Sequence, residues 1–412
     1  MSHPATAAQR RTDSKCDTFH IRSGGSLLDM SIRDEDPTAN RGTHLSAGLP
    51  FNDKLTLTSI DSRQFDCPAV ENLRRSMRAI LRRCGGPTAV DRDSSKQHLD
   101  HDLWRAIAGA LVSAGLGAVE SRRFTRRDWE LLSAAAAEFG AVPVDVPFLT
   151  SSVVAATIAR RVGQPALATR LARGANTAAL LTPYEQPIRP ASLGSMHAGR
   201  VWAFVPGVAG ARQAETLMIL CGDKLVSFDR EWAEMSTAAS VDGTRELVNV
   251  KVDGVHATVL AEGERALHAV AAAADAAGAV LAAEQAGLAA RCLQLSAHTG
   301  GAPHQHGGDR EMVAVEKADA AARYAGDCLV AEDPHVGIAV STAQVVCATV
   351  SFRVARMAAK SAQTSSHTTA LLLERARGNA LAFGGPLWHR RRLAQLSTAP
   401  IPVENPCYRR SR

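Results

Sequence analysis

The spacing of hydrophobic positions changes twice along this chain. From Pro68 to about Gly174, apolar residues recur at helical spacing, and glycine or proline marks the ends of the segments. Over residues 176–260 the pattern becomes a series of short runs rich in β-branched residues. From Ala261 onward helical spacing returns. The pattern therefore predicts helices, then strands, then helices again.

The first region is predicted to hold four helices. They begin at Pro68, about Asp100, Thr125, and Thr150 or Ser151. Gly85 and Gly86 end the first of them, because two glycines in succession disfavour a continuing helix. Thr125, Thr150 and Ser151 carry hydroxyl groups of the kind that cap helix N-termini. An all-α region ending near Gly174 follows from this pattern.

The second region contains six short runs rich in Val, Leu, Phe and Thr, separated by turn residues. These runs are NTAALLTP, RVWAFVPGV, ETLMILCG, KLVSFDRE, ELVNVKVDG and HATVLAEG. Many short strands without helices between them are typical of a small β-barrel or sandwich. The middle region is therefore predicted to be a β domain.

The third region opens with a long helical segment. Residues 261–297 are rich in alanine and contain no proline. A Gly- and His-rich break at residues 298–309 ends this helix, and a second helical pattern starts at Arg310. A third helix and most of a fourth follow Pro334. Long helices joined by short connections predict a helix bundle.

Composition narrows the choice of partners. The net charge of +6 comes mostly from arginine and suits an anionic ligand such as a coenzyme A thioester, or nucleic acid. No Lys/Arg run with interleaved aromatic residues of the kind that follows a phosphate backbone is present. Nucleic-acid binding is therefore not predicted, and the charge is read as surface arginine.

Cysteine usage bears on the cellular setting. The eight cysteines have no C-x-x-C spacing, so neither a zinc site nor a disulfide framework is predicted. Cys292 and Cys347 lie in apolar helical pattern and are expected to be buried. No uninterrupted apolar run is long enough to span a bilayer, and the N-terminus lacks the apolar core of a signal peptide. A cytoplasmic setting is expected.

Several segments carry a family resemblance. The run LAAEQAGLAARCLQLSAHTGGAPHQHGGDREMVAVEKADAAARY resembles the bundle helices of acyl-CoA dehydrogenases. LLTP resembles the segment of that family that touches the flavin ring, and AGRVWAFVPGVAGA the strand that covers it. FGGPLWHRRRLAQL resembles the closing segment. The resemblance runs from about Cys67 to Leu396 and is closest to short, divergent subunits of lipid- and steroid-degrading actinobacteria.

The resemblance implies an α+β, mostly α chain. Its expected parts are an N-terminal helical domain, a middle β-barrel domain and a C-terminal four-helix bundle, within residues 66–175, 176–260 and 261–396. A tail, 397–412, would follow. Residues 1–65 are rich in Ser, Thr, Asp, Gly and Arg with few large apolar residues, and are expected to be a disordered extension.

The resemblance also implies FAD as cofactor and an acyl-CoA thioester as substrate. Leu181, Thr182 and Phe204 stand where the family contacts the flavin. Gln305 and Gly307 match two positions of a short motif that reaches across a subunit interface to the flavin pyrophosphate. Assembly through the bundle, as a homo-oligomer or with a related subunit, is implied as well.

The implied flavin site departs from the family pattern at several positions. Pro303 replaces the arginine of the pyrophosphate motif and His306 replaces its phenylalanine. An arginine–phosphate contact is among the strongest polar pairings, so its loss weakens the site. The Gly-rich turn near the C-terminus of the family is held here by ERARGNALAF, with only Gly378 in common.

No catalytic base can be identified. Dehydrogenation needs a carboxylate whose pKa is raised so that it takes the α proton near neutral pH. The family places this Glu late in the chain or on the first bundle helix. Residues 388–403 contain no Asp or Glu, and Glu404 lies in a proline-flanked tail that would have to fold back. An ungapped alignment places Ala277 at the second position. Glu264, Asp275 and Glu284 lie nearby without matching it, and Glu284 in AAEQ is read as part of the structural pattern.

A metal site and a phosphate loop are weaker alternatives. His298, His304 and His306 lie on a Gly-rich stretch without a nearby carboxylate or cysteine partner, so no metal site is predicted. GGAPHQHGG lacks the lysine and the strand–loop–helix frame of a phosphate-binding loop.

Three hypotheses of function remain at this point. In the first, the protein is an FAD-dependent acyl-CoA dehydrogenase with its base at an unusual position, acting in lipid or steroid side-chain degradation. In the second, it is a non-catalytic subunit of the same fold that pairs with an active partner. In the third, it is a basic helical binding protein unrelated to flavin.

Overall fold

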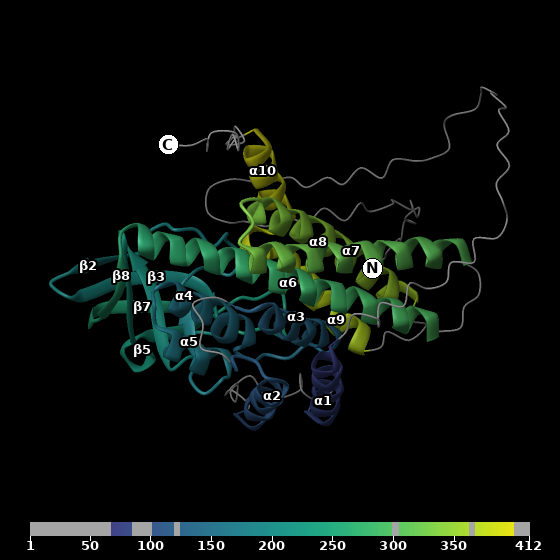
Figure 1. Cartoon of the computed structure of the whole chain (residues 1–412), viewed down its shortest axis with the longest axis horizontal. Coiled ribbons are helices and arrows are strands. Elements are labelled where there is room, and N and C mark those ends of the chain that lie inside the picture. Colours follow the sequence, from purple (N-terminus) through teal and green to yellow (C-terminus); the bar gives the residue numbers. More distant parts are fainter. Residues whose placement is uncertain (1–66, 85–100, 119–123, 299–304, 362–366, 399–412) are drawn as a thin grey trace, which may run out of the picture. The chain divides into compact units, whose positions relative to one another are not determined.

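The structure of the protein is a computed structural model, and it describes residues 67–84, 101–118, 124–298, 305–361 and 367–398 (Figure 1). The extension predicted for residues 1–65 and most of the predicted tail lie outside these ranges, as do Pro303 and His304. The described residues all belong to one compact unit. Helices flank a sheet in sequence order, as the hydrophobic pattern predicts.

The N-terminal region is helical. Its elements are α1 (Pro68–Cys84), α2 (His101–Ala114), α3 (Arg126–Ala141), the π-helical turn η4 (Phe148–Ala155), α4 (Ala156–Arg161) and α5 (Pro165–Ala172). Thr125 caps α3 as predicted: its hydroxyl accepts the Asp128 backbone N–H, and the Asp128 carboxylate accepts the Thr125 backbone N–H. The short helix α5 was not predicted.

The predicted start of the fourth helix was wrong. The segment becomes helical at Phe148, directly after Pro147, rather than behind a cap at Thr150 or Ser151. Ser151 does not cap because its hydroxyl accepts the backbone N–H of Ala178, at 3.1 Å, and so ties η4 to the first strand. The hydroxyl that suggested a cap connects the helical region to the sheet instead.

The middle region forms one mixed sheet. Its strands are β1 (Ala178–Leu180), β2 (Gly194–His197), β3 (Arg200–Ala209), β4 (Thr216–Cys221), β5 (Lys224–Asp229), β6 (Glu234–Ala238), β7 (Leu247–His256) and β8 (Thr258–Glu262). The order is β6-β7-β3-β2-β4-β5-β8, with β1 parallel to β4. The six predicted strands are present, and β2 and β6 were missed because GSMH and EMSTA contain few β-branched residues.

The sheet curls around an apolar core of its own. One cluster of buried apolar side chains contains Val205 of β3, Val250 of β7, Leu217 of β4 and Val226 of β5. Strands from both halves of the sheet can reach one cluster only if the sheet bends over it. The opposite side of β4 and β5 packs on the helices through residues such as Met218.

The C-terminal region consists of long helices. These are α6 (Glu264–His298), α7 (Gln305–Ala331), α8 (Val336–Ser361), α9 (His367–Leu381), a short turn (Ala382–Gly384) and α10 (Gly385–Thr398). The prediction that the second bundle helix starts at Arg310 was wrong, since α7 begins at Gln305. Asp309 lies near this N-terminus, where a negative charge favours the helix dipole and offsets the low helix propensity of Gly307 and Gly308.

The helices α3 and α6 cross at a very short distance. A Cβ atom on Gly140 of α3 would lie 1.9 Å from the backbone oxygen of Glu284 in α6. A Cβ atom on Gly287 of α6 would lie 2.1 Å from the backbone oxygen of Ala137. Each glycine is therefore required for the backbone contact that joins the N-terminal region to the bundle.

Two bundle helices are apolar enough to be compared with membrane spans. By length and mean hydropathy, α6 and α8 would suffice to cross a bilayer. About two-thirds of each apolar window is buried inside the protein, 67% for α6 and 61% for α8. The two helices pack on each other and on α3 or α7. Core helices of a bundle have this character.

The buried cysteines confirm their prediction. Cys292 and Cys347 are fully buried and carry free thiols. Burial raises the pKa of the Cys292 thiol to about 12 and also raises that of Cys347. Such thiols remain protonated and act as small apolar side chains.

His389 of α10 is a buried imidazole. It is 3% exposed, and its Nδ1 lies 3.3 Å from the Ser341 hydroxyl of α8. Burial, with a smaller contribution from the positive charge of Arg392, lowers the pKa of His389 to about 3. Its Nε2 has no hydrogen-bond partner among the described residues. The imidazole of His389 is therefore uncharged in the folded protein at neutral pH.

This environment predicts an acid sensitivity. Unfolded His389 binds a proton below pH 6.5 whereas the folded ring does not until about pH 3, so the free energy of unfolding falls as the pH drops through this window. Between pH 6.5 and 4 the contribution is on the order of 3 kcal/mol. In His389→Gln the loss of stability between pH 6.5 and 4 should be smaller than in the wild type, measured by urea unfolding. Identical pH slopes would contradict a buried neutral ring.

Candidate functional site

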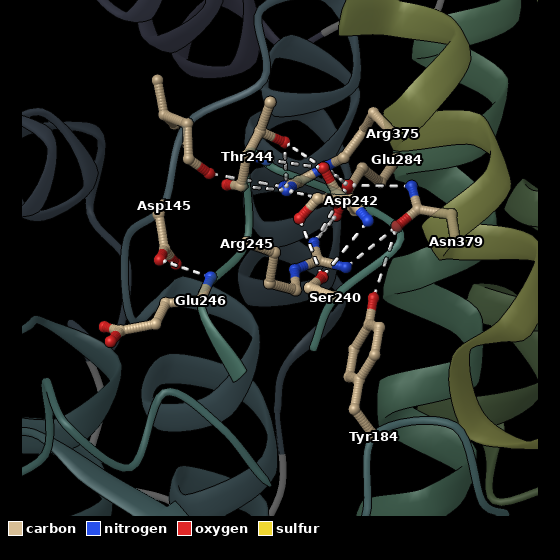
Figure 2. Close-up of polar contacts among 11 residues, drawn as sticks. Asp145, Tyr184, Ser240, Asp242, Thr244, Arg245, Glu246, Glu284, Arg375 and Asn379 are labelled. Atoms are coloured by element: carbon tan, nitrogen blue, oxygen red, sulfur yellow. Dashed lines mark hydrogen bonds and ion pairs between the residues drawn. The ribbon is translucent and has the colours of Figure 1, made fainter. Parts of the chain in front are cut away.

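A group of buried charges lies where the N-terminal region, the sheet and the bundle meet (Figure 2). We call it the junction cluster and define it as Asp145, Asp242, Thr244, Arg245, Glu284, Arg375 and Asn379. Asp145 precedes η4, the next three lie between β6 and β7, Glu284 is on α6, and Arg375 and Asn379 are on α9. Except for Asp145, which is partly buried, each of these side chains is almost fully enclosed.

Glu284 is at the centre of the junction cluster. Its Oε1 accepts hydrogen bonds from Arg375 Nε at 2.8 Å, from Asn379 Nδ2 at 3.0 Å and from Arg245 Nη2 at 3.2 Å. Arg245 Nη2 also lies 3.4 Å from Oε2. A carboxylate with this many donors is fixed in its ionised form.

Arg375 joins Glu284 to the loop before β7. Its Nη1 donates to Asp242 Oδ2 at 3.1 Å and to the Thr244 hydroxyl at 3.1 Å. The helix α9 comes close enough because Gly378 has no side chain: a Cβ atom there would lie 2.4 Å from Cβ of Asp242. Gly378 is the residue shared with the Gly-rich turn of the resembled family. Here a glycine is required because the backbone of α9 lies close to the side chain of Asp242.

Arg245 links the cluster to the segment after β1. Its Nη1 donates to Asn379 Oδ1 at 2.9 Å, and its guanidinium carbon lies 4.8 Å from the ring centre of Tyr184. The Tyr184 hydroxyl lies 3.4 Å from the same Asn379 oxygen. Residues 181–184 are therefore connected to the cluster through one aromatic side chain (Figure 2).

The electrostatics of Glu284 follow from these contacts. Burial acts to raise its pKa, but the attraction of Arg375 and Arg245 and the hydrogen bonds from Asn379 and Arg375 outweigh it, and the pKa lies below its ordinary value. A general base for an α proton needs the opposite shift, towards neutral pH. Glu284 is therefore a structural anion.

The two guanidinium groups remain charged. Burial is the largest influence on each pKa and acts to lower it. For Arg245, burial and the nearby charge of Arg375 lower the pKa to about 10. For Arg375, the carboxylates of Glu284, Asp242 and Asp145 overcome burial and raise the pKa. Both side chains are cations at neutral pH.

Asp145 differs from the other carboxylates of the cluster. Its Oδ2 accepts the Glu246 backbone N–H at 2.9 Å. Burial raises the pKa of Asp145, while this hydrogen bond and the charges of Arg245 and Arg375 act to lower it and Glu246 adds to the increase. Because Arg375 and Arg245 are engaged by Glu284 and Asp242, Asp145 is stabilised by them only at longer range.

The other base candidates are no better suited. Glu264 is exposed in the first turn of α6. The carboxylate of Asp275 accepts a hydrogen bond from Arg392 at 2.9 Å, as an ion pair. Ala277, at the position implied for the alternative Glu, is fully buried. Among the described residues, none of these groups combines an apolar pocket with a free carboxylate.

The residues expected to contact flavin lie on separate elements, after β1, on β3 and at the start of α7. The side chain of Leu181 is fully buried in the core of the sheet, and Thr182 is half-buried. Phe204, on β3, is 63% exposed. Gln305 and Gly307 fall in the first turn of α7, where the structure describes the backbone but not the side chains. Because Gln305 and Gly307 are expected to act across a subunit interface, the assignment of these five residues to a flavin site stays a prediction.

Two cavities among the described residues lie away from the residues expected to contact flavin. The larger one, of about 40 Å³, lies between α3, α4, α6 and α7 and is lined by residues including Trp129, Thr157 and Ala276. A water molecule occupies about 30 Å³ of the liquid, whereas drug-sized ligands need about 300 Å³ or more. Neither this cavity nor the smaller one beside Asp145 and Glu246 is lined by Leu181, Thr182 or Phe204.

Sequence reasoning missed most of the junction cluster, although a signal was present. Leu372, Arg375, Ala376 and Asn379 share one face of α9 at helical spacing, and all four are buried. An arginine on an apolar helix face indicates a buried partner of opposite charge. Glu284 within the apolar α6 is the matching signal, and its structural interpretation fits its observed contacts.

No protein-family profile matches the sequence, and no curated protein sequence matches it. Solved structures do. The chain is similar to the ChsE4–ChsE5 complex from Mycobacterium tuberculosis, with a TM-score of 0.66 and 17% identity over 82% of this chain and 99% of that one. It is also similar to a variant of the Tcur3481–Tcur3483 steroid ACAD, with a TM-score of 0.62 and 19% identity over 80% and 97% of the two chains.

A third similar structure is that of one enzyme rather than of a complex of two named chains. Butyryl-CoA dehydrogenase from Megasphaera elsdenii matches with a TM-score of 0.67 and 12% identity, covering 81% of this chain and 98% of that one. The predicted architecture of helical region, β region and bundle is confirmed by these matches. Identities this low establish the fold and leave activity to be argued from the residues.

Proposed function

Because this chain has the fold of the acyl-CoA dehydrogenases, we propose that it is a non-catalytic subunit of that fold, which pairs with a related catalytic subunit. The acyl-CoA thioester would be bound and oxidised by the partner. The cysteine pattern and the acyl-CoA chemistry of such a partner suit a cytoplasmic setting in lipid or steroid side-chain degradation. The alternative, a dehydrogenase that is active as this chain alone, has less support.

The state of Glu284 carries this proposal. It is the buried carboxylate of α6, and its oxygens accept hydrogen bonds from Arg245, Arg375 and Asn379. To take an α proton it would have to leave two cations and acquire a raised pKa. Breaking a buried ion pair costs about 3–5 kcal/mol, so such a step is strongly unfavourable.

The similar structures support a paired assembly. Two of them are complexes named for two different chains, ChsE4–ChsE5 and Tcur3481–Tcur3483. A chain whose described residues offer no suitable base can be retained in such an assembly because its partner supplies the chemistry. We therefore expect a hetero-oligomer in preference to a homo-oligomer.

Dehydrogenation assays test the proposal. The purified chain, a candidate catalytic partner, and the co-expressed pair are each incubated with acyl-CoA thioesters, FAD and an artificial electron acceptor. We expect no conversion above the protein-free rate for this chain alone, and conversion by the pair. Turnover by the chain alone would refute the proposal.

A variant pair locates the base within the assembly. In the pair, Glu264→Gln in this chain should leave the rate unchanged, because Glu264 is exposed at the start of α6. Replacing the partner's base carboxylate with an amide should reduce the rate at least about 100-fold, the usual contribution of a positioned base. The opposite result would place the chemistry in this chain.

A further inference from the structure

The arrangement of donors and charges points to a chain that binds no flavin by itself. We infer that its three regions are held together by the junction cluster, without a cofactor between them. This inference rests on the proposed function, in which the partner performs the oxidation. It concerns a separate property, however, because a chain without a base could still hold FAD.

The first argument concerns backbone donors. A flavin ring is oriented by hydrogen bonds to its ring nitrogens and oxygens. The N–H of Leu181 donates to Met218 O at 2.8 Å, and the N–H of Tyr184 donates to Gly207 O at 2.9 Å. The N–H of Gly207 in turn donates to Asn249 Oδ1 at 3.2 Å. The Tyr184 bond thus joins the segment expected to touch the ring to the strand expected to cover it, and the other two N–H groups donate to β4 and β7.

The second argument concerns the space beside Tyr184. Its carbonyl accepts the Phe383 N–H at 2.8 Å, and its ring meets that of Phe383 edge to face with centres 5.5 Å apart. Phe383 holds a left-handed backbone, with φ of 53°, in the turn between α9 and α10. Such a conformation is uncommon outside glycine and persists where its surroundings fix it. The segment after β1 and this turn are therefore packed together directly.

The third argument concerns Phe204 and its charged neighbours. Phe204 offers a largely exposed ring on the outer face of β3 and lines neither of the two cavities described above. The nearby cations are engaged, because Arg200 donates to Gly254 O at 2.6 Å and Lys251 pairs with Glu234 at 3.1 Å. A flavin diphosphate would have to compete with these contacts or find its cations elsewhere.

The junction cluster holds the N-terminal region, the sheet and the bundle together through ion pairs and hydrogen bonds. Its ion pairs run from Arg375 to Asp242 of the β6–β7 connection, and from Arg375 and Arg245 to Glu284 of α6. Asp145, which precedes η4, accepts a hydrogen bond from the backbone of the same connection, at Glu246. The N-terminal region, the sheet and the bundle are each attached to it. Both guanidinium groups are paired with carboxylates of the cluster without a bound ligand.

The test is a titration of the purified full-length chain with FAD. Flavin fluorescence and the melting temperature of the protein are followed up to about 100 μM FAD, where a micromolar site would be nearly filled and would raise the melting temperature. We expect neither saturable quenching nor a shift of the melting temperature. Stoichiometric binding, weakened in Phe204→Ser, would overturn the inference. Because Phe204 is exposed, this variant should fold like the wild type.

The outcome separates the inference from the proposed function. A chain that binds one FAD but converts no acyl-CoA would overturn the inference and leave the proposed function intact. Conversion of acyl-CoA by the chain alone would overturn the proposed function. Flavin that appears only in the co-expressed pair agrees with both, because the inference concerns the isolated chain.

Discussion

Glu284→Gln is expected to lower the free energy of unfolding by about 3–5 kcal/mol, which is the usual cost of removing one partner from a buried ion pair. The amide has no charge to offset Arg245 and Arg375. In one of its two flipped orientations its NH2 group would also face the N–H donors of these arginines. Urea unfolding at pH 7 measures the effect. Because the cluster joins three regions, the transition should also lose cooperativity.

The matched control is Glu264→Gln on the same helix. Glu264 is exposed in the first turn of α6, so its replacement should change stability by no more than about 0.5 kcal/mol. If Glu284→Gln were as mild as this control, the junction cluster would not hold the regions together. The structural interpretation of Glu284 would then be wrong.

Gly140→Ala is the second substitution with a large expected effect. The added methyl group would lie 1.9 Å from the backbone oxygen of Glu284 and 2.7 Å from the backbone nitrogen of Leu288. A helix backbone cannot move aside as a side chain can, so α3 and α6 would have to separate. We expect a loss of about 3 kcal/mol or more, at the upper end for overpacked sites, measured by thermal or urea unfolding.

Gly109→Ala supplies the control for this change. Gly109 lies inside α2, is exposed, and an added Cβ atom there would meet no other atom within 4 Å. The same substitution should stabilise the protein by about 0.5–1 kcal/mol, because alanine has the higher helix propensity. Equal effects at the two sites would mean that α3 and α6 do not cross in contact.

The order of helices and strands could be predicted because it depends on the spacing of apolar residues within each segment. Apolar residues at helical intervals in α1, and the capping pair Thr125 and Asp128, are features of one segment read by itself. The β2 and β6 strands could not be predicted in this way, because their strand conformation depends on pairing with β3 and β7.

The ion pairs of the junction cluster could not be predicted from any single segment of the sequence. Arg245 and Glu284 are 39 residues apart in sequence, and Arg375 lies a further 91 residues beyond Glu284. Each charge indicates that a partner exists, but the identity of that partner is a property of the assembled fold. The flavin positions, such as Leu181, were assigned by resemblance alone and stay a prediction.

The ionisation of Glu284 tests the central claim most directly. Protein labelled with 13C at the side-chain carboxyl of glutamate can be titrated by NMR, with the Glu284→Gln variant used to assign the signal. We predict that the Glu284 carboxylate stays ionised below its ordinary pKa of 4.5, because Arg245 and Arg375 hold its charge. A signal that titrates near neutral pH would show a poised base and contradict the non-catalytic assignment.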